Sequence, residues 1–202
     1  MVHFERKHIA PLMTLLCALV SFTAYFALQR NYEFLLYVGV IVFFTIVIAL
    51  TNGRLRYPLP IIWGLVLWAV LHMCGGGILV GEGVLYGVML VPLSNILPIL
   101  RYDQVVHMVG FGVATLLMFH VMSPLLRTDL ERWTALSIVV LMAGLGVGAV
   151  NEIVEFLATV LIPETGVGGY LNTALDLVAD FAGAILATAY LRVRGFRPWP
   201  NE

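Results

Sequence analysis

Long apolar runs separated by short polar breaks form the dominant pattern along this chain. Six runs cover residues 9–28, 34–50, 60–80, 105–122, 133–161 and 171–191. A helix of about 20 apolar residues is long enough to cross the hydrocarbon core of a bilayer. The pattern predicts an all-α fold, a polytopic membrane helix bundle with six transmembrane helices in a single integral membrane domain, residues 1–202. The first run is too long for a signal-peptide core and no Ala-x-Ala site follows it, so we expect it to be retained.

A further apolar stretch at residues 84–100 is interrupted by Pro92, Pro98 and the polar pair Ser94 and Asn95. Lys and Arg accumulate on the cytoplasmic side, and an added crossing would exchange the sides of everything downstream. Six crossings place nine basic residues on one side and two on the other, whereas seven give five against six. The nine are Arg6, Lys7, Arg54, Arg56, Arg127, Arg132, Arg192, Arg194 and Arg197, and the two are Arg30 and Arg101. We therefore expect both termini to be cytoplasmic and residues 84–100 to form a re-entrant or interfacial segment on the outer side.

The composition agrees with a membrane protein. Hydrophobic residues make up 61% of the chain and charged residues 11%, and the mean hydropathy is +0.97. A soluble chain could not bury so much apolar surface, so we expect a multi-pass protein of the plasma or inner membrane, with lipids as partners. The net charge of -1 argues against a nucleic-acid partner. Cys17 and Cys74 lie in apolar runs, which favours core residues over a disulfide.

Four acidic residues fall inside the last two apolar runs. Glu152 and Glu155 lie late in the fifth run, and Asp176 and Asp180 lie early in the sixth, with no Lys or Arg between them. A charged carboxylate in hydrocarbon costs roughly 3 kcal/mol or more. We therefore expect these carboxyl groups to be protonated, paired or bound to a metal ion.

The predicted topology brings further polar residues to the same depth. His72 falls toward the outer end of the third run, and Asp103 and His107 fall near the outer end of the fourth. Residues three or four positions apart lie on one helical face, so Asp103 and His107 can point the same way. Helices three to six are thus expected to build one site that faces the outer leaflet or the extracytoplasmic space.

Carboxylates combined with imidazoles are typical ligands of Zn, Mn or Fe, whereas an all-oxygen site would favour Mg or Ca. We assign catalytic roles to Glu152 and His107. The candidate metal ligands are Glu155, Asp176, Asp180, Asp103 and His72, and the candidate substrate-binding residues are Arg101 and Asn151. No other cofactor is expected.

Structural roles are open for several of these residues. Asp103 or Asp176 alone could cap a helix or reach lipid headgroups. Core hydrogen bonding explains His72 as well as ligation does, and Arg101 could anchor the chain at the interface. Gly144-x-x-x-Gly148 is a small-residue motif that lets helices approach closely, either within this chain or in a homo-oligomer.

Three short motifs follow one another: Tyr102-Asp103-x-x-x-His107, Asn151-Glu152-x-x-Glu155-Phe156, and Asp176-x-x-x-Asp180 followed by Gly183-Ala184. In order and spacing the chain resembles the small YjdF-type proteins of the bacterial inner membrane and, more distantly, VanZ-like proteins. The likeness covers residues 72–184, over half of the chain. The resemblance implies a polytopic fold and supports these site residues, but it implies no particular substrate.

Three classes of function fit this pattern. The first is a divalent-metal-dependent membrane hydrolase or transferase that acts on a lipid or lipid-linked substrate. The alternatives are a small proton- or cation-coupled transporter, since intramembrane acids commonly mark ion pathways, and a structural or accessory membrane protein with protonated, hydrogen-bonded acids.

Overall fold

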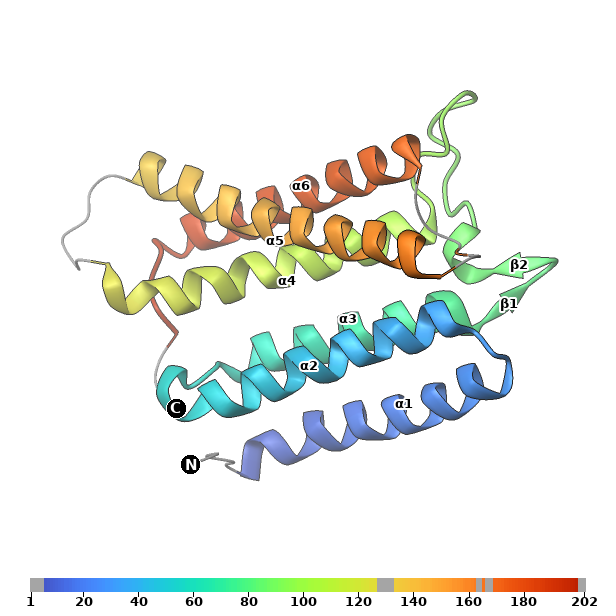
Figure 1. Ribbon diagram of the computed structural model, residues 1–202. Coiled ribbons are helices and arrows are strands. Elements are labelled where there is room, and N and C mark those ends of the chain that lie inside the picture. Colours follow the sequence, from blue (N-terminus) through green and yellow to red (C-terminus); the bar gives the residue numbers. More distant parts are fainter. Residues whose placement is uncertain (1–5, 127–132, 163–164, 166–168, 200–202) are drawn as a thin grey trace.

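Six long helices account for most of the chain (Figure 1). The computed structural model describes residues 6–126, 133–162, 165 and 169–199. Its long helices are α1 (Ile9–Leu28), α2 (Tyr32–Leu55), α3 (Leu59–Gly77), α4 (Tyr102–Met122), α5 (Trp133–Leu161) and α6 (Tyr170–Val193), with short 3-10 turns η1 (Arg6–His8), η2 (Leu85–Gly87) and η3 (Ser123–Leu125). In the described part of the chain, six helices are long and apolar enough to cross a membrane, which confirms the predicted bundle. Arg127 and Arg132, used above to orient the chain, lie outside the described residues.

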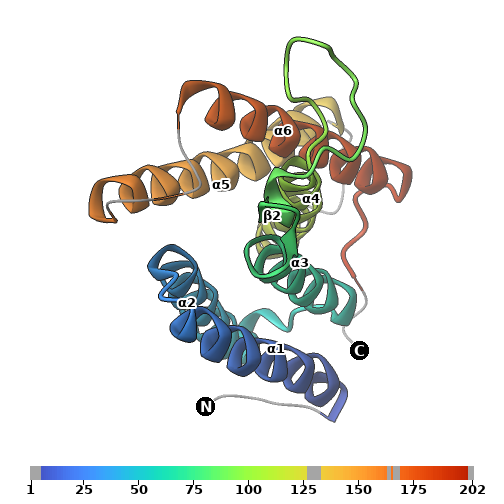
Figure 2. The same ribbon diagram turned by 90° about the vertical axis from the view of Figure 1, so that its right-hand side faces the viewer.

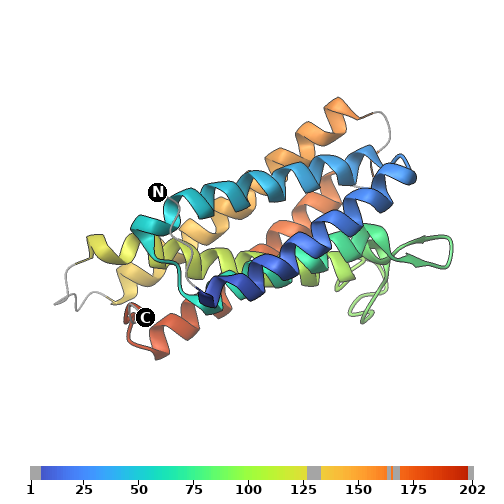
Figure 3. The same ribbon diagram turned by 90° about the horizontal axis from the view of Figure 1, so that it is seen from below.

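The helices form two groups of three (Figure 2). Helices α1, α2 and α3 pack around an aromatic core that includes Phe26, Phe34 and Tyr37. Helices α4, α5 and α6 pack closely against one another, and α3 joins the two groups by packing against α4. The view from below shows the six helices running along a common direction (Figure 3). This arrangement brings the first turns of α4 and α6 and the last turns of α5 to the same end of the bundle.

Residues 84–100 do not cross the bundle. Strands β1 (Leu79–Val80) and β2 (Gly83–Val84) form an antiparallel hairpin whose turn contains Gly81 at a φ of 61°. Residues 88–100, all of which the structure describes, form no helix and extend as a loop at one end of the bundle (Figure 1). The rings of Pro92 and Pro98 provide no backbone N–H group, which disfavours a continuous helix here.

Gln104 fixes the junction between this loop and α4. Its Oε1 accepts hydrogen bonds from the backbone N–H groups of Leu100 (2.6 Å) and Arg101 (3.0 Å), and its Nε2 donates to the carbonyl of Pro98 (3.1 Å). These bonds satisfy two donors that precede the helix. The first turn of α4, which carries Asp103, therefore starts from a defined position.

Candidate functional site

The imidazole of His107 lies at the centre of a group of carboxylates. Its Nδ1 is 2.9 Å from Oδ1 of Asp180 and 3.8 Å from Oε1 of Glu152. Its Nε2 is 3.7 Å from both Oδ1 of Asp103 and Oε1 of Glu155. We call these five residues together with Asp176 the carboxylate–histidine cluster. Side chains from α4, α5 and α6 thus meet at one point, whereas the sequence predicted that the third helix would contribute as well.

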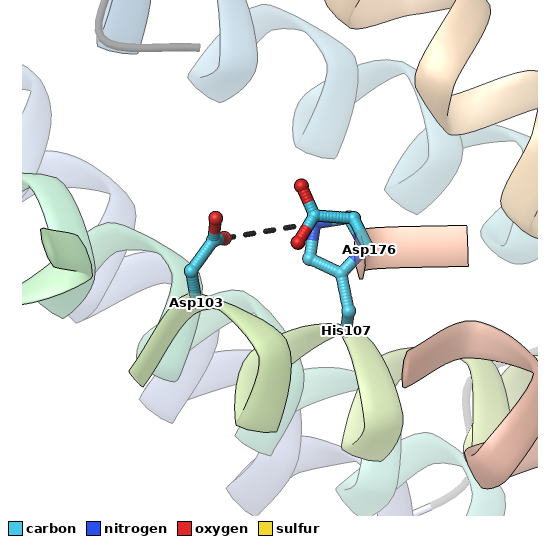
Figure 4. Close-up of side chains that lie close together, drawn as sticks. All are labelled: Asp103, His107 and Asp176. Atoms are coloured by element: carbon cyan, nitrogen blue, oxygen red, sulfur yellow. Dashed lines mark ion pairs between the residues drawn. The ribbon is translucent and has the colours of Figure 1, made fainter. Parts of the chain in front are cut away.

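Asparagine amides orient several of the carboxylates. Nδ2 of Asn172 donates to Oδ2 of Asp176 (2.5 Å) and to Oδ2 of Asp103 (3.3 Å). Figure 4 shows Asp103, His107 and Asp176 facing one another between α4 and α6. Asn172 was missing from the candidate site residues, although its position one helical turn before Asp176 could have indicated it.

The amide of Asn151 likewise orients the carboxylate of Glu155. Its Nδ2 donates to Oε1 of Glu155 at 2.8 Å, within α5. The structure therefore places the amide of Asn151, predicted to bind substrate, against a carboxylate of the cluster. This contact holds Glu155 on the side of its helix that faces His107.

Most side chains of the cluster are buried, so their polar atoms have no access to water. His107, Glu152, Glu155, Asp176 and Asp180 are each at most 7% exposed. Both carboxylate oxygens of Glu152, Oδ1 of Asp176 and Oδ2 of Asp180 are buried without a hydrogen-bond partner among the described residues. Leaving a buried polar atom unpaired costs about 1–3 kcal/mol, and more for a charged group. These oxygens therefore need a proton or a cation.

Close backbone contact between α4 and α6 sets this geometry. A Cβ atom on Gly183 would collide with the backbone carbonyl of Met108, the residue after His107. Gly183 follows Asp180 by three positions, so the contact that needs glycine also brings Asp180 beside the imidazole. The cluster can therefore form only because residue 183 is a glycine, which lets α6 approach α4 closely.

Glycines of α5 complete the packing. A Cβ on Gly148 would collide with the carboxylate of Asp180, and one on Gly144 would collide with the hydroxyl of Thr115 on α4. The small-residue motif of α5 therefore serves contacts within this chain. Both glycines are buried against its own helices.

Two overlapping groups of side chains can each hold a cation. One consists of Asp103, His107 and Asp176, and the other of His107, Glu152 and Glu155, with ligand atoms within 4.8 Å of one another in each group. One imidazole combined with carboxylates fits Zn, Mn or Fe by donor type. The structure thus gathers donors that could hold a divalent metal ion.

His72 lies outside both groups. Its Nδ1 forms a 2.5 Å hydrogen bond with the hydroxyl of Tyr86, and its ring packs against the rings of Phe34, Tyr37 and Trp68. Burial raises the pKa of Tyr86 well above its usual value, so the phenol in this contact stays protonated. The structure thus gives His72 a contact with the segment that follows the hairpin.

A cavity of about 320 Å³ reaches the cluster from this end of the bundle. Glu33 at the start of α2, Tyr86 of η2 and Asp103 contribute to its walls. Glu33 and Tyr86 were not among the candidate site residues, because they are far from the cluster in sequence.

Arg101 is the N-cap residue of α4, and its Nε is buried with no hydrogen bond to any residue that the structure describes.

Comparison with known proteins gives one match. A family described as "Predicted membrane protein (DUF2238)" matches residues 9–196, nearly the whole chain. The chain belongs to this family. The match covers all six long helices and every residue of the carboxylate–histidine cluster. No curated protein and no solved structure matches the chain.

Proposed function

We propose that the carboxylate–histidine cluster binds a divalent transition-metal ion, Zn, Mn or Fe. The supporting observation is that His107 belongs to both groups of potential ligands and is buried with them. Nε2 of His107 would bind the ion, with Asp103 and Asp176 or with Glu155 as further ligands. The positive charge of the ion would then compensate the negative charge of the carboxylate oxygens that have no hydrogen-bond partner.

Asp180 takes a different role in this proposal from the one assigned from sequence. Its Oδ1 lies 2.9 Å from Nδ1 of His107, so in this proposal it accepts a hydrogen bond from the ring nitrogen that does not bind metal. Such carboxylate–histidine pairs fix the tautomer and orientation of a metal-binding imidazole. Asp180 is therefore a positioning residue, and Gly148 leaves the space that it occupies.

The activity that this site supports best is hydrolysis or group transfer on a lipid or lipid-linked substrate. A bound metal ion would polarise a phosphoryl or acyl oxygen or activate a water molecule. Glu152, whose two oxygens lack a hydrogen-bond partner in the described structure, is placed to act as general base. The cavity beside Asp103 would give the substrate a route to the cluster, and the guanidinium group of Arg101 would bind an anionic headgroup.

The distribution of acidic residues favours this enzyme over a carrier. All acidic residues that the structure describes lie at the end of the bundle that holds the cluster. A path for protons or cations should continue with polar groups toward the opposite end, where the described residues include no Asp or Glu.

The proposed setting is the bacterial inner membrane, with both termini cytoplasmic and the cluster on the outer side. The excess of basic residues at one end of the bundle supports this orientation, and the resemblance to proteins of the bacterial inner membrane supports the choice of membrane. Pairing of copies through Gly144 and Gly148 is not part of the proposal, because Thr115 and Asp180 of the same chain fill the space beside them.

Elemental analysis of detergent-purified protein tests the proposal. We expect near-stoichiometric Zn, Mn or Fe in the wild type and background levels in His107→Ala, with folding checked by circular dichroism and gel filtration. Glu82→Ala is the matched control, because Glu82 is an exposed acid of the hairpin turn outside both ligand groups. A wild type that stays free of metal after incubation with these ions would contradict the proposal and favour proton binding.

Turnover is tested separately on lipid phosphate esters and acyl esters in nanodiscs. We expect Glu152→Gln to keep the metal ion and lose activity, because the amide cannot accept a proton as a base. A folded, metal-loaded Glu152→Gln protein with full turnover would remove Glu152 from this role.

A further inference from the structure

A second cavity lies at the end of the bundle opposite the carboxylate–histidine cluster. Its volume is about 470 Å³, within the range of small-molecule sites. It lies where the C-terminal ends of α2 and α4 meet the segment after α6 (Figure 1). Arg54, Arg56, His120, Ser123 and Trp199 contribute to its walls, and we call it the basic pocket.

The charge of the basic pocket is positive. No acidic side chain is among its described lining residues, and Arg194 adds a third guanidinium group 4.8 Å from the ring centre of Trp199. The ends of α2 and α4 each contribute a partial negative charge of about half a unit. The two full charges of Arg54 and Arg56 exceed that contribution, so an anion is favoured here.

His120 supplies a further polar group in the wall. It is 7% exposed, and its Nε2 donates a hydrogen bond to the carbonyl of Leu55 at 2.8 Å. Its Nδ1 is buried and has no hydrogen-bond partner within the described ranges.

The turn that contains Arg56 and follows Arg54, a residue of the last turn of α2, is held in place before any ligand binds. Oδ1 of Asn52 accepts a hydrogen bond from the backbone N–H of Tyr57 (3.0 Å), and the hydroxyls of Thr51 and Tyr57 are 2.8 Å apart. Between them, Arg56 adopts a left-handed conformation with a φ of 49°. Because its backbone is already ordered, this turn loses little freedom when a ligand binds.

We propose that the basic pocket binds a phosphate group, through the guanidinium groups of Arg54 and Arg56 with His120 in the wall. Guanidinium groups match the oxygens of a phosphate in a bidentate geometry. Basic pockets between helices at the end of a bundle also lie at the depth of lipid headgroups. The phosphate is carried by an anionic lipid or is free in solution, and this site is independent of the metal site.

The test compares two variants that each lose two positive charges. Arg54→Gln, Arg56→Gln removes the arginines of the pocket, and Arg6→Gln, Arg192→Gln removes two exposed arginines of the same end that do not line it. Native mass spectrometry on protein from phosphatidylglycerol nanodiscs measures retained anionic lipid. Calorimetric titration with inorganic phosphate, in phosphatidylcholine nanodiscs, measures binding of free phosphate.

We expect the pocket variant to bind about tenfold more weakly than the wild type in one of the two measurements, and the control variant to stay within about twofold. Loss of retained phosphatidylglycerol identifies a lipid headgroup, and loss of saturable phosphate binding identifies free phosphate. Equal losses in both variants would mean a general effect of surface charge and would overturn the proposal. A folded wild type that binds neither probe would overturn it as well.

Discussion

The two ends of the bundle carry opposite charges, and they carry them in different ways. At one end, carboxylates of α5 and α6 that are at most 7% exposed surround His107 of α4. At the other end, Arg54 in the last turn of α2 and Arg56 just after it are exposed. A buried charge must be compensated by the protein or its ligand, whereas an exposed charge is compensated by water and salt. The acidic end is therefore tied to the packing of the helices, and the basic end is not.

The largest expected effect comes from breaking the packing beneath the acidic end. Gly183→Ala places a methyl group against the backbone carbonyl of Met108, which cannot move away as a side chain would. We expect the free energy of unfolding to fall by about 3 kcal/mol, as for overpacked cores. Thermal unfolding in detergent measures it. Gly146→Ala is the control, since nothing described lies within 4 Å of the added atom.

The second prediction weakens the metal site without removing a ligand. Asp180→Asn keeps the shape of the side chain but removes the charge that orients His107 through the 2.9 Å contact. We expect metal affinity to fall by about 10- to 100-fold, measured by titration against a competing chelator. An unchanged affinity would show that Asp180 does not act through the imidazole.

The third prediction concerns the segment that closes the acidic end. Because the pKa of Tyr86 is raised in the folded protein, above pH 10 the unfolded chain loses this proton while the folded protein keeps it. The free energy of unfolding should therefore fall as pH rises, by at most about 1.4 kcal/mol per pH unit for this group. Tyr86→Phe should remove this contribution to the slope of the free energy of unfolding against pH. The control is Tyr25→Phe, which should leave that contribution intact, because the hydroxyl of Tyr25 forms no hydrogen bond with the described residues. Equal slopes in all three proteins would contradict the assignment.

The smallest effect is expected at the basic end. Arg54→Gln, Arg56→Gln should change the free energy of unfolding by no more than about 0.5 kcal/mol, because both side chains are exposed. Chemical denaturation followed by circular dichroism checks it. A loss comparable to that of Gly183→Ala would show that the arginines support the fold and would remove the contrast between the two ends.

The helices themselves follow from the sequence. The first and fifth apolar runs, residues 9–28 and 133–161, coincide with α1 and α5. The second run, residues 34–50, is shorter than α2, which continues through Asn52 to Leu55. Apolar length is a local property, so it is visible without knowledge of contacts. The positions of Asn52 and Arg54 inside α2 were missed, because polar residues at the end of a helix look like a loop in sequence.

The depth of the site was also contained in the sequence. A helix rises by about 1.5 Å per residue, so the distance of Asp103, Glu152 and Asp176 from the ends of their helices fixes their level in the membrane. Together with the count of basic residues, this was enough to predict that α4, α5 and α6 would contribute acids at one end.

Only the tertiary structure decided which of these side chains touch and through which atoms. His72 was expected in the cluster and instead contacts Tyr86, whereas Asn172, considered only as a hydrogen-bond partner of the acids in a structural protein and not as a site residue, contacts two carboxylates. Sequence spacing gives the direction of a side chain within its own helix but not the rotation of that helix against its neighbours. That rotation is fixed by the contact of Gly183 with Met108, which turns Asp180 toward Nδ1 of His107.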